Sequence, residues 1–540
     1  MRKKLFLFFT VVYVYVGLAQ NPYFEISKQM EIYNDVLKKL STNYIEELNI
    51  GDLVQKNTKK MLNSLDRFTT FYDEQGILDE KMRQEGHFGG LGIRTQYRDS
   101  VIVITDILKK SPAYDQLQIG DRILEIEKKD VAEMDRKMAH NLLKGAVGSE
   151  VSLLIERNKK KIPVTITRAD IALDAVTVSR LDGEIGYIRL VKFNKKASQQ
   201  VKKALIDLKK QGATSLIIDV RNNPGGLLNE VIKIVNFFIP KGKVVVTTKG
   251  RFKKYNRTYK TNNESVDEEM PLVILVNNRS ASASEILSGA LQDYDRAVII
   301  GDTTYGKGLV QRTYPLKYGT YIKQTISKYY IPSGRLIQKK DYWNRDKNGK
   351  PLPMRLNLPE KEFTTINGRK VYNLGGIIPD IVIDGQPQHS LIGDLLKKNY
   401  LFDFATWYYY HQNRPKNPID FKLKEADFEL LLEYLKKHNL NPKSTAENTL
   451  EKAYKKAQKE KQGEQILTLY KQLLKAYQHT DEFVLRKYQS YILDYINLDL
   501  SNRYFGIEGY TTYMLLNDKA LLKAKEVLKN KSMYDQILNR

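Results

Sequence analysis

The fold of this chain is restricted above all by an alternation of short apolar runs and helical segments between about residues 180 and 385. The expected strands are 185–190, 215–220, 272–276 and 297–300, and the expected helices are 197–211, 228–238 and 283–293. Such alternation predicts an α/β core built on parallel strands. Active sites of these sheets form at the carboxyl ends of the strands. The turn at 223–226 and Ser282 each closely follow such an end, so we expect chemistry there.

The chain has 540 residues, which is too long for one hydrophobic core, so several domains are expected. Segments with helical spacing precede and follow the α/β core, and a β-rich stretch is inserted before it. The region beyond about residue 390 is rich in lysine and tyrosine, carries no chemical motif and reads as a helical platform. The predicted division is 1–19, 20–84, 85–170, 171–390 and 391–540.

The first of these segments is typical of a signal peptide. Arg2 and two lysines precede an apolar run that ends at Leu18, and small residues precede an expected cleavage site after Ala19. The run is shorter than the roughly 20 residues of a membrane-spanning helix, although an uncleaved anchor is the alternative. We therefore expect an exported protein of the periplasm or cell envelope. The chain contains no cysteine, so its stability must come from packing without disulfides.

Composition restricts partners and chemistry. The formal net charge is +25, from 88 Lys and Arg against 63 Asp and Glu, but the basic residues form no single block. This distribution is typical of a solvated surface and does not indicate a nucleic-acid binder. Association with an anionic membrane surface is kept as a secondary hypothesis. With no cysteine and six scattered histidines, neither a metal nor another cofactor is expected, and an enzymatic nucleophile would be a serine.

The β-rich segment 85–170 resembles a PDZ domain. The resemblance rests on a glycine loop at Gly90, Leu91, Gly92 and Ile93, which is followed by strands, a Gly-Asp-Arg-Ile turn at 120–123 and a helix near 135–144. In such a loop, successive backbone N–H groups bind the terminal carboxylate of a peptide that adds as a strand. The Ala-Gly pair usual before Leu117 is absent. A closed domain that binds no tail is therefore the alternative.

Ser282 invites two interpretations. Together with Glu285 it fits a capping box, in which the serine only satisfies free N–H groups at a helix start. The alternative is a nucleophile, because Ser282 follows a buried strand and a helix N-terminus can stabilise an oxyanion. The glycine turn at 223–226 could supply a further N–H group.

Lys307 also has a competing interpretation. The segment 301–307 matches the start of a phosphate-binding loop, but that loop requires Ser or Thr next and then a helix. Here Gly308 follows, and 309–314 has the character of a strand, so nucleotide binding is not expected. On a strand, Lys307 and Gln311 would point to the same side.

At this point the chain resembles the C-terminal processing peptidases, also called tail-specific proteases, of serine–lysine peptidase family S41. The matching segments occur in family order between about residues 65 and 380: 219–226, 280–286 with 292–293, 301–311, 330–335 and 376–380. Ser282 lies 25 residues before Lys307, which resembles the family spacing and singles it out from Ser280 and Ser284. The resemblance implies a multidomain α/β protein, with a ClpP/crotonase-like protease core, an inserted PDZ domain and helical regions at both ends.

The resemblance also implies residue roles. Ser282 would attack the scissile carbonyl, Lys307 would be the neutral general base, and Gln311 would orient its amine. The backbone N–H groups of Ala283 and Gly225 would form the oxyanion hole, with Gly225 preferred to Gly226.

The implied function is an exported serine endopeptidase that recognises exposed, apolar C-terminal tails of proteins or peptides, with an adaptor protein as a further candidate partner. The alternative hypothesis is a non-catalytic PDZ adaptor on a degenerate protease scaffold.

Two segments depart from the family pattern. Arg67 and Phe68 stand where Pro-His often follows the Leu-Asp pair, a change that we expect to leave the catalytic set untouched. Residues 339–374 form a polar insertion that we expect at the surface.

Overall fold

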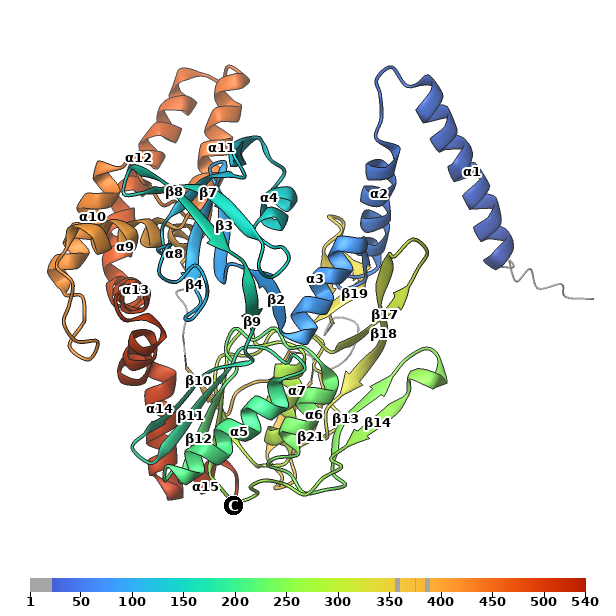
Figure 1. The fold of residues 1–540 in the computed structure, drawn as a ribbon, viewed down its shortest axis with the longest axis vertical. Coiled ribbons are helices and arrows are strands. Elements are labelled where there is room, and N and C mark those ends of the chain that lie inside the picture. Colours follow the sequence, from blue (N-terminus) through green and yellow to red (C-terminus); the bar gives the residue numbers. More distant parts are fainter. Residues whose placement is uncertain (1–21, 355–359, 374, 384–388) are drawn as a thin grey trace, which may run out of the picture.

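The computed structural model describes residues 22–354, 360–373, 375–383 and 389–540. Figure 1 shows three bodies of structure: an α/β core, a smaller β-rich domain beside it, and a helical region that runs along both. The expected signal peptide, residues 1–19, lies outside the described residues.

The core contains a six-stranded sheet in the order β10-β11-β12-β15-β16-β23, in which β10 is antiparallel to β11 and the other neighbours are parallel. The strands are β10 (Val176–Asp182), β11 (Ile185–Leu190), β12 (Ser215–Asp219), β15 (Leu272–Val276), β16 (Val298–Gly301) and β23 (Ile381–Val382). The parallel order confirms the prediction from the alternating pattern.

Helices cover both faces of this sheet. Leu216 and Ile218 pack against α5 (Ala197–Lys210), α6 (Leu228–Val235) and α7 (Ala283–Asp293). Ile217, on the opposite face of β12, packs against α14 (Lys519–Lys529) and α15 (Lys531–Ile537). Burial on both faces explains why the strands read as continuous apolar runs.

A second sheet, in the order β1-β18-β13-β14 with β17 paired to β18, packs against the core. Its strands are β1 (Thr70–Tyr72), β13 (Val244–Lys249), β14 (Arg257–Lys260), β17 (Leu309–Pro315) and β18 (Tyr321–Tyr330). The helical pattern expected before the β-rich segment is realised in α1 (Pro22–Asn43), α2 (Ile50–Leu65) and α3 (Glu74–Glu85). Thr70–Tyr72 instead forms a strand, because these residues pair with Tyr321–Lys323 of β18.

The β-rich domain has a sheet in the order β3-β4-β5-β7-β8, with β6 paired to β5, and a separate pair of β2 with β9 that joins it to the core. Its elements are β2 (His87–Gly90), β3 (Ile93–Arg98), β4 (Val101–Ile107), β5 (Arg122–Ile126), β6 (Lys129–Asp130), α4 (Arg136–Leu142), β7 (Glu150–Arg157), β8 (Lys160–Thr167) and β9 (Ala169–Ala172). This order agrees with the strands and helix expected from the sequence.

The helical region contacts both other bodies (Figure 1). Its helices before α14 are α8 (Ser390–Lys397), α9 (Tyr400–His411), α10 (Glu425–Lys437), α11 (Thr445–Lys459), α12 (Glu464–Lys487) and α13 (Gln489–Asn517). Asp403 of α9 accepts two hydrogen bonds from Arg98 of the β-rich domain, at 2.9 and 2.7 Å. Asp518, just before α14, accepts two from Arg221 of the core at 2.9 Å. The helical region therefore bridges the other two bodies.

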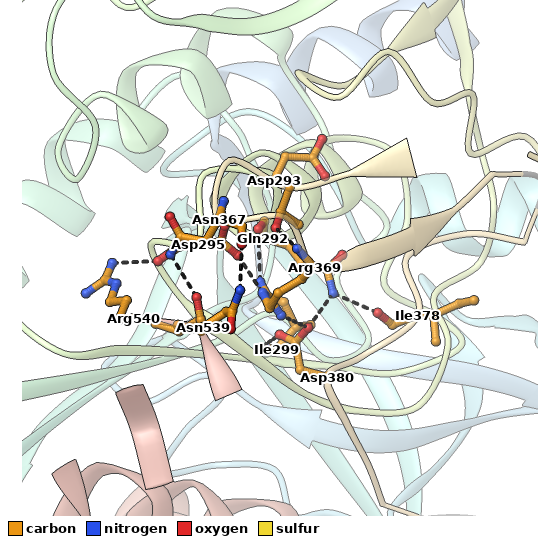
Figure 2. Close-up of polar contacts among 12 residues, drawn as sticks. Gln292, Asp293, Asp295, Ile299, Asn367, Arg369, Ile378, Asp380, Asn539 and Arg540 are labelled. Carbon is orange, nitrogen blue, oxygen red and sulfur yellow. Dashed lines mark hydrogen bonds and ion pairs between the residues drawn. The ribbon is translucent and has the colours of Figure 1, made fainter. Parts of the chain in front are cut away.

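The carboxyl end of α7 is held by a polar network (Figure 2). Arg369 of the insertion 339–374 forms ion pairs with Asp295 and Asp380. Asn367 donates its backbone N–H to Asp295 at 2.6 Å. Most described residues of the insertion are exposed, as expected, but Arg369 is partly buried against the core, where Asp295 and Asp380 supply the carboxylate partners that its charge requires. The insertion therefore contacts and stabilises the carboxyl end of α7, the helix that begins next to Ser282.

The amino-terminal helix α1 extends from the body, and most of its described side chains are exposed (Figure 1). No helix within the described ranges combines the length and apolar character required to cross a membrane.

Candidate active site

Ser282 lies where β15 leads into α7, as its N-cap residue, with φ 57° and ψ −112°. It is partly exposed, whereas Ser280 and Ser284 are fully buried. The hydroxyls of those two neighbours donate to backbone carbonyls, Ser280 to Val220 at 2.8 Å and Ser284 to Asn223 at 2.9 Å. Of the three serines, Ser282 is therefore the one that a substrate could reach.

Glu285 connects the candidate nucleophile and base through the backbone. Its Oε2 accepts the N–H of Ser282 at 2.8 Å and the N–H of Lys307 at 2.9 Å. Its Oε1 accepts from the Thr304 hydroxyl at 2.6 Å and the Gly306 N–H at 2.7 Å. Burial raises the pKa of Glu285 to about 7, while these four donors favour the ionised form. One buried carboxylate thus fixes two loops that are distant in sequence.

The Lys307 amine lies against an aromatic ring. Its Nζ is 4.5 Å from the centroid of Phe68. Burial lowers the pKa of Lys307 to about 8; the positive charge of Lys323 acts in the same direction and the charge of Glu285 opposes it. Among the described residues, no hydrogen bond joins this amine to the Ser282 hydroxyl. The two groups share a backbone anchor but are not in hydrogen-bond contact.

Tyr329 of β18 forms a second link between the two loops. Its hydroxyl donates to the Lys307 carbonyl and lies 3.3 Å from the Ser282 carbonyl. Burial raises the pKa of Tyr329 well above its usual value, so the hydroxyl stays a neutral donor. The loops of the candidate nucleophile and the candidate base are consequently tied by a carboxylate on their N–H groups and by a phenol on their carbonyls.

Gln311 lies on β17 and donates to the Thr325 hydroxyl at 3.3 Å. Lys307 precedes β17, and the pairing register with β18 shifts between Val310 and Gln311. Strand alternation therefore does not fix the direction of Gln311 relative to Lys307. Its orienting role stays a prediction.

The glycine turn abuts the start of α7. A Cβ on Gly225, whose φ is +98°, would lie 2.8 Å from both the Ala283 nitrogen and the Ser282 Cβ, so this approach requires glycine. The Gly225 N–H donates to the Asn223 side chain at 2.9 Å. Within the described part of the chain, the N–H groups of Ala283 and Gly226 have no acceptor. Two free donors therefore lie at the glycine turn and the start of α7, next to the candidate nucleophile Ser282.

The loop at Gly90–Ile93 of the β-rich domain also presents free donors. Gly92 has φ +77°, and a Cβ there would lie 2.1 Å from the Ser111 Cβ. The carbonyls of Leu91 and Gly92 accept from other backbone N–H groups, but their own N–H groups have no acceptor in the described residues. This arrangement suits a carboxylate.

Three neighbours of Lys307 were not identified from the sequence as part of the site. Glu285 was recognised only as a capping partner, and Tyr329 and Phe68 carried no signal except their place in or near matching segments. Within the described ranges, no cluster of three or more His, Cys, Asp or Glu side chains could hold a metal ion.

Comparisons with known proteins agree with this architecture. A model described as peptidase family S41 matches residues 184–343, and a PDZ domain model matches residues 89–167. A model described as the C-terminal helical domain of a probable PDZ-protease matches residues 391–528.

Individual relatives cover more of the chain. A carboxy-terminal-processing protease of Bartonella bacilliformis is 33% identical over 326 residues, which are 59% of this chain and 74% of that protein. A probable CtpA-like serine protease of Staphylococcus saprophyticus is 30% identical over 454 residues, which are 82% of this chain and 85% of that protein. Among solved structures, the photosystem II D1 C-terminal processing protease is 24% identical with a TM-score of 0.37, covering 65% of this chain and 87% of that one.

The chain belongs to peptidase family S41. It is a serine-type peptidase similar to the C-terminal processing proteases, with a PDZ domain, an S41 core and a helical C-terminal region. The predicted family and fold class are confirmed.

Proposed function

We propose that this peptidase is exported, selects proteins by their C-terminal tails and cuts them with Ser282 as nucleophile and Lys307 as base. The main support for the Ser282–Lys307 dyad is a shared hydrogen-bond acceptor, because one Glu285 oxygen accepts the backbone N–H groups of both residues. A non-catalytic adaptor would have no need of this tether. Export rests on the N-terminal sequence pattern.

The proposed reaction begins with neutral Lys307, whose Nζ takes the hydroxyl proton as Ser282 Oγ attacks the scissile carbonyl. The oxyanion accepts hydrogen bonds from the Ala283 N–H and from the glycine turn. The ammonium of Lys307 then protonates the leaving amine. In the second half a water molecule, deprotonated by the same lysine, attacks the acyl-enzyme, and the lysine returns that proton to the departing Ser282 oxygen as the carboxylic acid product is released.

The glycine turn offers two candidates for the second donor. Gly226 has a free N–H, whereas Gly225 would have to give up or share its bond to Asn223. Free-enzyme contacts of this kind often tighten only when substrate binds, so both stay candidates, as does the orientation of the lysine by Gln311.

Substituting the base is the first test. Lys307→Ala is expected to abolish cleavage of an unfolded protein with an apolar C-terminus, and kcat/KM of the parent should rise with pH through about 8, because only the neutral amine accepts a proton. Lys192→Ala is the matched control, since burial lowers the pKa of Lys192 to about 8 as well. Retained cleavage in Lys307→Ala, or loss only in Lys192→Ala, would contradict the dyad.

Tail recognition is tested through the substrate. Amidating the substrate's C-terminus should lower kcat/KM by about 10- to 100-fold, because charge-assisted hydrogen bonds to the free N–H groups of the loop are lost. Gly92→Ala should remove the preference for the free carboxylate. Gly148→Ala is its control: this glycine also has positive φ, at +86°, but a Cβ there meets nothing within 4 Å. Equal cleavage of free and amidated substrates by the parent would reject tail recognition.

The remaining expectations are part of the same proposal. We assign residues 20–84, 85–170, 171–390 and 391–540 to the amino-terminal helical region, the PDZ domain, the protease core and the C-terminal helical domain. Protein or peptide substrates with apolar tails are the proposed partners. An adaptor protein and an anionic membrane surface are secondary candidates, of which the latter rests on the net charge of +25.

A further inference from the structure

The segment between α2 and β1 lies next to Lys307, the candidate base, and several hydrogen bonds hold it there. Asp66 accepts the N–H groups of Phe68 and Thr69 at 2.7 and 2.8 Å, and the Thr69 hydroxyl at 2.8 Å. The Thr69 hydroxyl in turn accepts the Thr325 N–H of β18 at 3.1 Å. The Phe68 ring packs edge-on against Tyr342, with 5.6 Å between centroids. Backbone hydrogen bonds and side-chain packing together fix the position of the Phe68 ring next to Lys307.

The preceding residue holds the loop that carries the lysine. Arg67 donates to the Tyr305 hydroxyl at 2.5 Å, two residues before Lys307. Its guanidinium also lies 5.7 Å from the Phe68 ring centroid and 5.8 Å from that of Tyr305. Arg67 therefore contacts Tyr305 of the Lys307 loop, and Phe68 contacts the Lys307 amine. They are also the two residues at which this chain departs from the Pro-His of the family pattern.

We propose that Phe68 is a positioning residue for Lys307: its ring holds the protonated amine in the resting enzyme and governs how readily that amine becomes the neutral base. The proposal rests on the proposed role of Lys307 and goes beyond it. It gives the Arg-Phe departure a role that was not expected from the sequence, because the Phe68 ring lies 4.5 Å from the Lys307 amine.

The ring has two opposing effects on the amine. Its face attracts the cation, which favours the protonated form. Its apolar bulk excludes water, which favours the neutral form. The charged groups facing the amine from other elements are Lys323 on β18, Glu285 on α7, Asp66 before β1 and Glu80 on α3. All four residues are unchanged in the Phe68 variants, so a comparison of substitutions at this residue tests the two effects of the ring.

The two effects predict shifts of opposite sign. Phe68→Leu keeps the apolar bulk and loses the ring, so the neutral amine is favoured and the rise of kcat/KM should move to lower pH, by about half a unit to one unit. Phe68→Ala loses the ring as well, but it also admits water; because burial is the largest cause of the lowered pKa of Lys307, hydration should outweigh the lost attraction and the rise should move to higher pH. Phe68→Tyr keeps the ring and should retain the parent profile.

The experiment measures kcat/KM against pH for the full chain and these three variants, with circular dichroism to verify folding. Phe402→Leu is the matched control, because it removes a comparable contact, 4.6 Å from the Arg503 guanidinium to the ring, within the helical region. Its pH profile should equal that of the parent. Phe68→Leu and Phe68→Tyr keep the test valid if the alanine variant does not fold.

The outcomes separate this inference from the proposed function. Parent-like profiles in Phe68→Leu and Phe68→Ala, or shifts of both in one direction, would overturn the role of Phe68 while Lys307→Ala stays inactive. Parent-like cleavage by Lys307→Ala would instead reject the dyad and this inference with it.

Discussion

Ser282→Ala is expected to lower kcat by on the order of 10⁴-fold or more, because it removes the hydroxyl that we propose forms the acyl-enzyme. Cleavage of an unfolded protein with an apolar C-terminus measures the loss. Labelling by a fluorophosphonate, which reacts with activated serines, should disappear in the same variant.

The neighbouring serines are matched controls for this prediction. Ser284→Ala and Ser280→Ala remove hydroxyls that donate to buried carbonyls, so each should reduce the free energy of unfolding by about 1 kcal/mol and leave labelling intact. Parent-like cleavage by Ser282→Ala, or labelling that depends on Ser284, would refute the assignment of the nucleophile.

Glu285→Ala is expected to have the second largest effect. It leaves the N–H groups of Ser282, Gly306 and Lys307 and the Thr304 hydroxyl without their acceptor. We expect the free energy of unfolding to fall by about 3 kcal/mol or more. We also expect kcat to fall by about 100-fold or more, because the nucleophile and base loops lose their common anchor. Chemical unfolding and active-site-normalised kinetics measure the two effects separately.

Glu230→Ala tests whether instability alone explains the loss. Glu230 is also buried, and it accepts the Ser198 N–H at 2.8 Å and a hydrogen bond from Lys233, but among the described residues it has no hydrogen bond to the Ser282 or Lys307 loop. Its loss should destabilise the core and leave kcat per folded enzyme unchanged. Glu285→Gln keeps one acceptor oxygen but places an amide donor against two of the four donors, so its losses should be smaller than those of Glu285→Ala. Normal kcat in folded Glu285→Ala enzyme would refute the tether.

Short sequence patterns were sufficient to predict those elements whose formation depends on neighbouring residues in the chain. The buried strands, the glycine turn and the position of Ser282 after β15 all follow from periodicity and turn chemistry over short windows. The strand Thr70–Tyr72 could not be predicted from a short window, because it forms by pairing with β18, which is distant in the sequence. The same limit applies to the site. The capping partner Glu285 was recognised from its spacing to Ser282, but its bond to Lys307 joins residues 22 positions apart.

Lys307 shows why the spacing of residues along the sequence was insufficient to predict the arrangement of the site. The rule that residues i and i+4 share a side holds inside a regular strand, but Lys307 lies before β17 and a register shift separates it from Gln311. Phe68 reaches the amine from 239 positions earlier in the chain, through a segment whose place is fixed by Asp66 and β18. No periodicity connects such residues.

The backbone of Ser282 has a thermodynamic consequence for the whole enzyme. At φ 57° and ψ −112°, a residue with a Cβ is held in a conformation that costs about 1–3 kcal/mol. This cost lowers the ratio of folded to unfolded protein by a factor of about 5 to 150. It is a large share of the total stability, because natural domains are stable by only about 5–15 kcal/mol. Glycine would relieve the strain but would carry no hydroxyl. At this position the proposed role as nucleophile and the requirement for maximal stability therefore favour different amino acids.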